Sequence, residues 1–442
     1  MDNINEILEW INSLNRTTIV NINRIKLSES NYWFLDENED IITNKNNSFF
    51  SVKAISGMLN GKEIEQPIIV QDEIGFLGII MQIKDNIPYF LMQAKIEPGN
   101  INCVQISPTI QATKSNFTQV HGGNKPHYLD YFYNYSNYNV VYDQIQSEQS
   151  SRFFKKRNRN VIIEIDGSID IVVFENFKWM TLKQIKLLMN YDNLVNMDTR
   201  TVISCLPLEN IKFKSITDDI YNTNRELYNS IFDDNCVYER QKITSKLVDY
   251  KMFSKNKLEI KKLSEMNNWV VNDNGIIHKS KYPFKVSYFD IEIEGREVRK
   301  WNQPLFEACE IALFGLIVAD FNGVLKVLTK LTVEIGCFDN VELGPTIQLN
   351  SIGDCNSNNV ERLFLNHVNK KENILNDVLL SEEGGRFYHE QNRNIIVKID
   401  KDVLVDISNE YEWLSLSTLS NLIKHNNYLN IQLRNLLSII EI

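Results

Sequence analysis

The chain has 442 residues, of which 43% are hydrophobic, and a formal net charge of −10 at pH 7. This length exceeds what one hydrophobic core usually supports, so we expect two or three domains of a soluble globular protein. The acidic balance argues against a nucleic-acid partner, because phosphate binding requires a basic surface. The most apolar run, residues 308–319, contains Glu310 and is too short to cross a bilayer.

The first predicted element in chain order is a helix over residues 4–14, where apolar side chains recur at helical spacing. Residues 89–112 predict two strands joined by a turn at Pro98-Gly99. These strands lead into a polar loop that ends at Gly122-Gly123. Because loops on a strand scaffold often hold binding residues, we expect the binding chemistry in this region.

The pattern of this region returns 237 positions later, in residues 331–348. Glu334 takes the place of Glu97, and a second Pro-Thr-Ile-Gln run takes the place of the first. A longer match joins residues 147–166 to residues 381–400, which are identical at ten of twenty positions. The chain is therefore an internal duplication.

We expect an N-terminal repeat over residues 1–206 with its leading helix, a helical linker over 207–261, and a C-terminal repeat over 262–442. Each repeat places several short strands before one helix, which we expect around Trp179 in the first repeat and around Trp413 in the second. This order predicts an α+β fold, with two similar cores related by a pseudo-twofold axis.

Several polar and aromatic residues are candidates for ligand binding. The polar loop offers a cation, hydroxyls and amides, a set that suits a pyrophosphate, although a solvated surface loop fits the pattern as well. Trp33 and Trp269 occupy matching positions, where each could stack on a base or serve the core. Arg152 and Arg386 also match, and could bind phosphate or a carboxylate of the other repeat. The loop candidates are Gln111, Thr113, Lys114, Ser115, Asn116 and Phe117.

Candidates for proton transfer are few. Glu97 and its match Glu334 lie at strand-to-turn junctions, where a carboxylate could be a base or could cap the turn. His121 precedes the double glycine, and His389 follows Arg386. The sequence has no dinucleotide-binding glycine motif, no P-loop and no metal-ligand spacing of Cys or His. We therefore expect side-chain acid–base chemistry without a cofactor or metal.

Long stretches of both repeats resemble the NDP-hexose 2,3-dehydratase family. The resemblance is carried by residues 93–100, 104–117 and 120–123 in the first half, and by residues 341–348 and 380–389 in the second. These motifs are long enough to be specific, and the resemblance covers nearly the whole chain.

The resemblance implies a cytoplasmic homodimer of duplicated Nudix-like lobes that acts on dTDP-4-keto-6-deoxyglucose. Such enzymes remove water across C2 and C3 to give a 3,4-diketo-2,6-dideoxy sugar, which a 3-ketoreductase then reduces. Each lobe can hold a sugar nucleotide, with one site catalytic and the other vestigial. The family's nucleotide-binding positions would fall on residues 113–117 and on Trp33, Trp269, Gln348, Leu349 and Asn350.

The resemblance leaves the catalytic lobe open. In the first lobe we expect His121 or Glu97 as base or acid, with Lys114 or Asn116 facing the substrate. In the second lobe, Glu383 and His389 remain candidates. Two other readings predict different behaviour: a Nudix-type nucleotide hydrolase, although the Nudix box is absent from the sequence, and a sugar-nucleotide-binding protein without activity.

Overall fold

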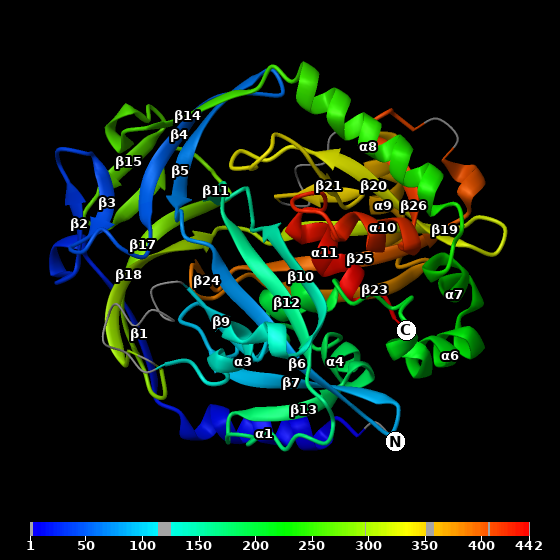
Figure 1. The fold of residues 1–442 in the computed structure, drawn as a ribbon. Coiled ribbons are helices and arrows are strands. Elements are labelled where there is room, and N and C mark those ends of the chain that lie inside the picture. Colours follow the sequence, from blue (N-terminus) through cyan, green and yellow to red (C-terminus); the bar gives the residue numbers. More distant parts are fainter. Residues whose placement is uncertain (1–2, 114–124, 297, 351–357, 405–406, 442) are drawn as a thin grey trace.

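The structure is a computed structural model that describes residues 3–113, 125–296, 298–350, 358–404 and 407–441. Within these residues the strands form four mixed sheets, two in each half of the chain (Figure 1). Helices and strands are interspersed along the chain, so the fold is a mixed α and β fold with two similar halves.

The first half carries most of its helices at its ends. Its elements are α1 (Asn5–Thr17), β1 (Val20–Ile25), β2 (Trp33–Asp36), β3 (Ile41–Asn44), β4 (Ser51–Leu59), β5 (Lys62–Val70), β6 (Gly75–Lys84), β7 (Ile87–Ile96), β8 (Val104–Ser107), β9 (Ile110–Ala112), α3 (Leu129–Tyr133), β10 (Asn139–Ser147), β11 (Phe153–Phe154), β12 (Arg157–Glu164), β13 (Phe177–Thr181), α4 (Leu182–Leu188) and α5 (Met197–Ile203).

Three helices connect the halves: α6 (Lys214–Thr223), α7 (Arg225–Ile231) and α8 (Cys236–Phe253). The second half then repeats the order of the first. Its elements are β14 (Lys257–Lys261), β15 (Trp269–Asn272), β16 (Gly275–His278), β17 (Phe284–Ile293), β18 (Lys300–Ala308), β19 (Ala312–Asp320), β20 (Leu325–Thr332), β21 (Glu342–Gly344), β22 (Ile347–Leu349), α9 (Asn359–Lys370), β23 (Ile374–Ser381), β24 (Phe387–Tyr388), β25 (Gln391–Ile399), β26 (Tyr411–Ser415), α10 (Leu416–Ile423) and α11 (Ile431–Ser438).

The two larger sheets have the same strand order. One runs β10-β12-β6-β7-β13 and the other runs β23-β25-β19-β20-β26. In both, one central pair is parallel, β12 with β6 and β25 with β19. The central strands β6 and β19 read as nearly continuous apolar runs, which is typical of strands covered on both faces. The topology therefore confirms that the halves are copies of one fold.

The halves exchange their first strands. β1 of the first half pairs with β17 of the second, and β14 of the second pairs with β4 of the first. Helices α5 and α11 also pack against each other. As a result, the largest hydrophobic cluster combines residues of both halves, such as Ile79 and Leu316. The sequence predicted two similar cores; the halves are similar, and strand exchange merges much of their two interiors.

Some local predictions were confirmed and others were not. The leading helix is present as α1, and the helical pattern of the linker corresponds to α6 and α7. Trp179 and Trp413, expected in helices, lie in β13 and β26, and the helices begin only after them. The caps Thr181 and Ser415 explain the boundary, because each hydroxyl accepts a hydrogen bond from an amide three residues ahead. No helix of the described residues is long and apolar enough to span a membrane.

Several residues that the two repeats share serve the fold. The Thr109 hydroxyl accepts a hydrogen bond from the Ile80 amide at 2.9 Å, and Thr346 accepts one from Ile317 at the same distance. A Cβ atom on Gly78 would lie 2.5 Å from the ring of Phe132, so only glycine leaves room for this aromatic side chain. These matched residues hold strands and helices in register.

Candidate functional site

The backbones of the two halves are in direct contact at Gly99, in the turn after β7. Its amide donates to the Gly384 carbonyl at 2.7 Å, and its carbonyl accepts from the His389 amide at 2.9 Å. A Cβ atom on Gly99 would lie 1.6 Å from the carbonyl oxygen of Phe387, so no other residue permits this approach. Gly336 makes the equivalent contact with the loop around Ser150. Each contact borders a pocket with walls from both halves.

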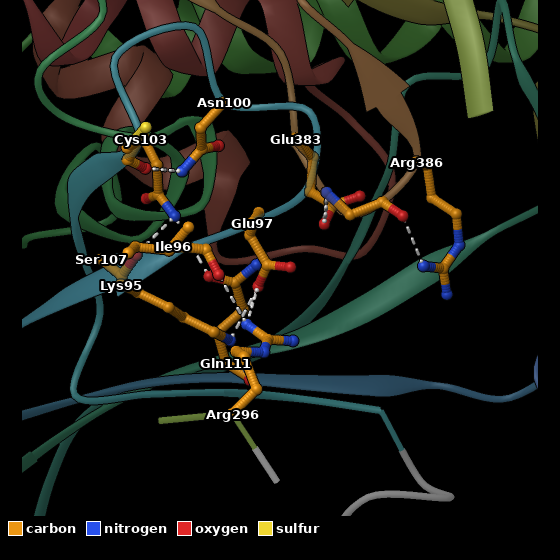
Figure 2. Close-up of polar contacts among 12 residues, drawn as sticks. Lys95, Ile96, Glu97, Asn100, Cys103, Ser107, Gln111, Arg296, Glu383 and Arg386 are labelled. Atoms are coloured by element: carbon orange, nitrogen blue, oxygen red, sulfur yellow. Dashed lines mark hydrogen bonds and ion pairs between the residues drawn. The ribbon is translucent and has the colours of Figure 1, made fainter. Parts of the chain in front are cut away.

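The first of these pockets, here called the charged pocket, collects ionisable side chains from both halves (Figure 2). The first half contributes the end of β7 and helix α5. The second half contributes the loop before β24 and the connection between β17 and β18. The ionisable residues of the lining are Lys95, Glu97, Glu148, Lys156, Asp198, Arg296, Glu383 and Arg386.

Glu97 is held between two cations in this pocket. Its Oε1 lies 2.9 Å from the Arg296 guanidinium and 3.0 Å from Lys95 Nζ. Burial alone would raise the pKa of Glu97, but the positive charges of Arg296 and Lys95 outweigh burial and lower it to about 2. Glu97 is therefore a fixed negative charge that orients the two cations.

Glu383 lies across the pocket in a different electrostatic setting. Its Oε1 accepts a hydrogen bond from the Gly385 amide at 2.8 Å. Burial is the main reason that its pKa rises to about 7; Arg386 opposes this effect, while the negative charges of Glu97 and Glu148 add to it. A carboxyl with a pKa near 7 can both accept and donate a proton at neutral pH, as acid–base catalysis requires.

Two further ionisable residues, Asp198 and Lys156, line the charged pocket. The pKa of Asp198 is raised well above its usual value, first by burial and then by repulsion from Glu148 and Glu383. Burial also lowers the pKa of Lys156 to about 8, although Glu148 and Glu73 partly offset the effect. The charged pocket thus contains acids and bases with pKa values spread on both sides of neutrality, a pattern found at catalytic sites.

An aromatic recess adjoins the charged pocket and shares Glu97, Arg296 and Arg386 with it. It encloses about 1350 Å³, including the part that is open to solvent. Its walls combine aromatic rings with amide side chains and one lysine. The residues concerned are Asn31, Tyr32, Trp33, Asn46, Phe49, Lys300, Trp301 and Asn302. Flat aromatic walls with polar groups at their edges suit a planar heterocycle.

The second inter-half pocket, here called the amide pocket, has the same position in the duplicated fold but a different lining. Three charged residues of the charged pocket are replaced by neutral ones: Lys95 by Thr332, Asp198 by Gln432 and Glu383 by Gln149. Arg296 has no counterpart, because residues 294–299 join β17 to β18 whereas only residues 60–61 join β4 to β5.

The matching glutamates of the two pockets consequently differ in charge. Glu334 of the amide pocket accepts a hydrogen bond from the Gln348 amide at 2.8 Å. Burial, together with the nearby Glu342, raises the pKa of Glu334 to about 8. Glu334 is thus protonated at neutral pH whereas Glu97 is ionised. One ancestral position has acquired opposite protonation states in the two halves.

The structure brings several predicted site residues to these pockets. Glu97, Gln111, Thr113, Glu383 and Arg386 line the charged pocket, and Trp33 lines the aromatic recess. Arg152, Glu334, Gln348, Leu349 and Asn350 line the amide pocket. Lys114, Ser115, Asn116, Phe117 and His121 lie outside the described residues.

Two predicted site residues fall elsewhere. The ring of His389 is exposed and stacks on Tyr388 with 4.1 Å between centroids, and His389 is not part of the charged-pocket lining. Trp269 is buried, and its Nε1 donates to the Glu65 carbonyl at 3.2 Å. Like Trp33, which is 3% exposed, Trp269 belongs to the core that the two halves share, but unlike Trp33 it borders neither the aromatic recess nor the amide pocket.

The sequence reasoning missed Lys95, Asp198 and Arg296 as site residues. The sequence did contain a signal for two of them. When the two repeats are aligned, Lys95 is matched with Thr332 and Asp198 with Gln432, so a charged residue is matched with a neutral one. Arg296 lies in a connection that is longer in the second repeat than in the first. Matched positions at which the repeats differ in charge would have pointed to Lys95 and Asp198, but not to Arg296, which has no matched position.

A sequence model described as NDP-hexose 2,3-dehydratase matches residues 4–206 and 240–440 of the chain. The chain belongs to the NDP-hexose 2,3-dehydratase family. Three proteins named dTDP-4-dehydro-6-deoxy-alpha-D-glucopyranose 2,3-dehydratase are similar to it. The protein from Saccharopolyspora spinosa is 34% identical over 94% of this chain and 87% of its own length. Those from Streptomyces violaceoruber and Amycolatopsis orientalis are 34% and 31% identical, over 95% and 99% of this chain and 93% and 90% of their own lengths.

Membership in the dehydratase family agrees with the acid–base character of the charged pocket. Among the described residues, no group of three or more His, Cys, Asp or Glu side chains is placed to hold a metal ion. The ionisable groups that line the charged pocket are carboxyls, ammonium groups and guanidinium groups, which move protons or stabilise charge.

Proposed function

We propose that this chain removes water across C2 and C3 of dTDP-4-keto-6-deoxyglucose, and that the charged pocket is where it does so. The similar proteins are named for this substrate. One observation supports the assignment to the charged pocket. The pocket contains an ionised Glu97, held by Arg296 and Lys95, together with carboxyls whose pKa values are much higher. An elimination of this kind needs a base, an acid and a stabiliser of negative charge.

Glu383 is the base in this proposal. The hydrogen on C3 is acidic because it lies next to the C4 ketone, and a carboxylate with a pKa near 7 accepts it far more readily than one with a pKa near 2. The higher pKa favours Glu383 over Glu97; His121 and His389 were the other candidates that the sequence left open. General base catalysis contributes about 10²–10⁴-fold to the rate.

Lys95 stabilises the enolate oxygen at C4 in this proposal. Its ammonium donates to the Gln111 carbonyl at 2.9 Å and contacts Glu97 at 3.0 Å, which fixes its position. An ammonium has three N–H groups, so these contacts leave one donor for the substrate among the partners described. Fixed donors of this type are worth about 10²–10³-fold in rate.

We place the nucleobase in the aromatic recess, whose lining includes the buried Trp33 and the less buried Trp301, and the diphosphate between the recess and the charged pocket. Arg386 lines both the aromatic recess and the charged pocket. The guanidinium donates to the Gly385 carbonyl at 2.9 Å, and its Nε has no partner among the described residues. We expect Trp33→Phe to raise the Kd for dTDP while Trp269→Phe leaves it unchanged, in a fluorescence titration.

The amide pocket is not catalytic in this proposal. Gln149 and Gln432 occupy the places of Glu383 and Asp198 and cannot exchange protons at neutral pH. Binding there would be compatible with Arg152, which remains in the lining. We therefore expect substitutions in the amide pocket to leave the rate of dehydration unchanged.

The experiment is incubation of the purified chain with dTDP-4-keto-6-deoxyglucose, followed by mass analysis of the sugar nucleotide. The proposal expects loss of one water from the sugar while the diphosphate stays intact. A Glu383→Gln variant should lose this activity, and Glu334→Gln, its control in the amide pocket, should retain it. Release of dTMP without dehydration, or equal loss in both variants, would refute the proposal.

The family resemblance supports four finer proposals. We propose that the lobes are Nudix-like, that the chain forms a homodimer in the cytoplasm, and that a 3-ketoreductase consumes the diketo product. Light scattering tests the dimer, and cell fractionation tests the location. Coupling to a 3-ketoreductase with NADPH tests the last proposal, because product formation should then oxidise one NADPH for each sugar.

A further inference from the structure

Asp198 has a buried carboxyl group, and one of its two oxygens lacks a hydrogen-bond partner among the described residues. It lies in α5, its side chain is 2% exposed, and it lines the charged pocket. Its Oδ1 has no hydrogen-bond partner in the part of the chain that the structure describes. Because an unpaired buried carboxylate is costly, a group in this state is expected to bind a proton or a ligand.

The surroundings of Asp198 favour the protonated form. The carboxyls of Glu148, Glu383 and Glu97 all act on it, and Lys95 is the one cation among the stronger influences. Burial and all three carboxyls raise the pKa of Asp198, while Lys95 lowers it. These influences favour the neutral form of Asp198, which has a proton to donate.

The fold itself does not require an acid at this position. Helix α11 repeats α5 and has Gln432 where α5 has Asp198. The structural neighbours are present in both helices: Asn196 and Asn430 cap them, and Arg200 and Arg434 each donate to a carbonyl of the other half. A structural role would be served equally by glutamine, so the carboxyl of Asp198 calls for a chemical explanation.

We propose that Asp198 is a catalytic residue of the dehydration, the acid that donates a proton to the C2 oxygen as it leaves. This inference rests on the proposed function, in which Glu383 takes the C3 hydrogen. The geometry supports it, because Asp198 and Glu383 come from different halves of the chain and line the same pocket. A hydroxide ion is a poor leaving group, and protonation allows it to leave as water.

The two carboxyls complete a balanced cycle. The Glu383 carboxylate takes the C3 hydrogen, and the electrons of the C3–H bond form the enolate at C4. When the enolate collapses, the C2=C3 bond forms, the C2–O bond breaks, and Asp198 gives its proton to the departing oxygen. The product at this point is an enol with its hydroxyl at C3. Asp198 then takes the proton of this hydroxyl, and Glu383 returns its proton to C2. The diketone and one water leave, and both carboxyls regain their starting states.

The test uses a substrate whose leaving group needs no proton. In the 2-deoxy-2-fluoro analogue of the nucleotide 4-keto-6-deoxyglucose, fluoride leaves without an acid. We expect Asp198→Asn to slow dehydration of the normal substrate by about 10²-fold or more. The same variant should release fluoride within a few-fold of the unchanged protein, and it should still exchange the C3 hydrogen with deuterium from solvent. A merely structural role for Asp198 would slow all three measurements together.

Two controls separate the possible failures. Gln432→Asn, the matched change in the amide pocket, should leave every rate unchanged. If Asp198→Asn does not fold, Asp198→Gln takes its place, because glutamine already occupies this position in α11. The inference is overturned if the variant dehydrates the normal substrate at the unchanged rate, or if fluoride release falls as far as dehydration does. If the unchanged protein dehydrates nothing, the proposed function fails instead.

Discussion

Replacing Glu383 by glutamine should abolish activity and stabilise the protein at the same time. Activity should fall by about 10²–10⁴-fold, because the amide cannot accept the C3 hydrogen. The stability effect has the opposite sign and depends on pH. In the folded chain Glu383 has a pKa of about 7, against an ordinary value of 4.5 that we take for the unfolded chain.

The sign follows from this difference in pKa. Below pH 4.5 the carboxyl is protonated in both the folded and unfolded states, so it contributes nothing to the pH dependence. Between pH 4.5 and 7 the unfolded chain releases the proton while the folded chain keeps it, and the folded state loses about 1.4 kcal/mol per pH unit. The full effect above pH 7 is about 3 kcal/mol. Since part of the side chain faces the pocket, we expect a measured value of about 1–3 kcal/mol.

The assay is chemical denaturation of the unchanged and variant proteins at pH 4.5 and pH 8. One kcal/mol shifts the Tm of so long a chain by only about 1 °C, so denaturant midpoints are the better measure. Glu383→Gln should match the unchanged protein at pH 4.5 and exceed it at pH 8. Glu334→Gln is the control in the amide pocket: its carboxyl also has a raised pKa, about 8, so the variant should gain stability in the same direction while dehydration stays unchanged.

A Glu383→Gln variant that is less stable than the unchanged protein at pH 8 would refute burial as the cause of the raised pKa. A Glu334→Gln variant that loses activity to the same extent as Glu383→Gln would refute the assignment of catalysis to the charged pocket. In that case the two pockets would contribute equally to the reaction.

Three further predictions follow from the contacts around Glu97. Arg296→Met should raise the pKa of Glu97 and lower kcat more than it changes the Kd for dTDP, and an unchanged kcat would contradict the role of this pair. In the folded chain the pKa of Glu97 is about 2, below its ordinary value of 4.5. The ionised carboxylate therefore stabilises the fold above pH 4.5, and this stabilisation is lost as the pH falls toward 2. Glu97→Gln should reduce the difference in unfolding free energy between pH 6 and pH 3 by about 2 kcal/mol. Gly99→Ala should destabilise the chain by about 3 kcal/mol or more, since its Cβ would collide with a carbonyl, whereas Gly295→Ala, with open space around its Cβ, should cost about 1 kcal/mol.

The internal repeat made the duplicated fold predictable, because the matched residues are those that hold strands and helices together. Thr109 and Thr346 illustrate this, since each bridges neighbouring strands of its own half. The exchange of β1 and β14 could not be predicted. An extended segment such as residues 20–25 has the same pattern whichever half supplies its partner strand, and only tertiary packing decides between them.

The candidate site was predictable in part. Glu97, Glu383 and Arg386 were found because they belong to repeated motifs, and they do line the charged pocket. Asp198 was missed because it follows no motif and lies far from the other residues in sequence. Its role emerges only when α5 is packed beside the loops of both halves. The choice between Glu97 and Glu383 as base depends on burial and neighbouring charges, which a linear pattern does not contain.

The strand exchange between the halves bears on how such a chain could arise. In a one-copy ancestor that kept this exchange, the first strand would pair with the sheet of a second identical molecule. In such an assembly every change of sequence appears in both pockets at once. Joining the copies in one polypeptide removes this constraint, and a carboxylate can then be kept on one side while an amide replaces it on the other.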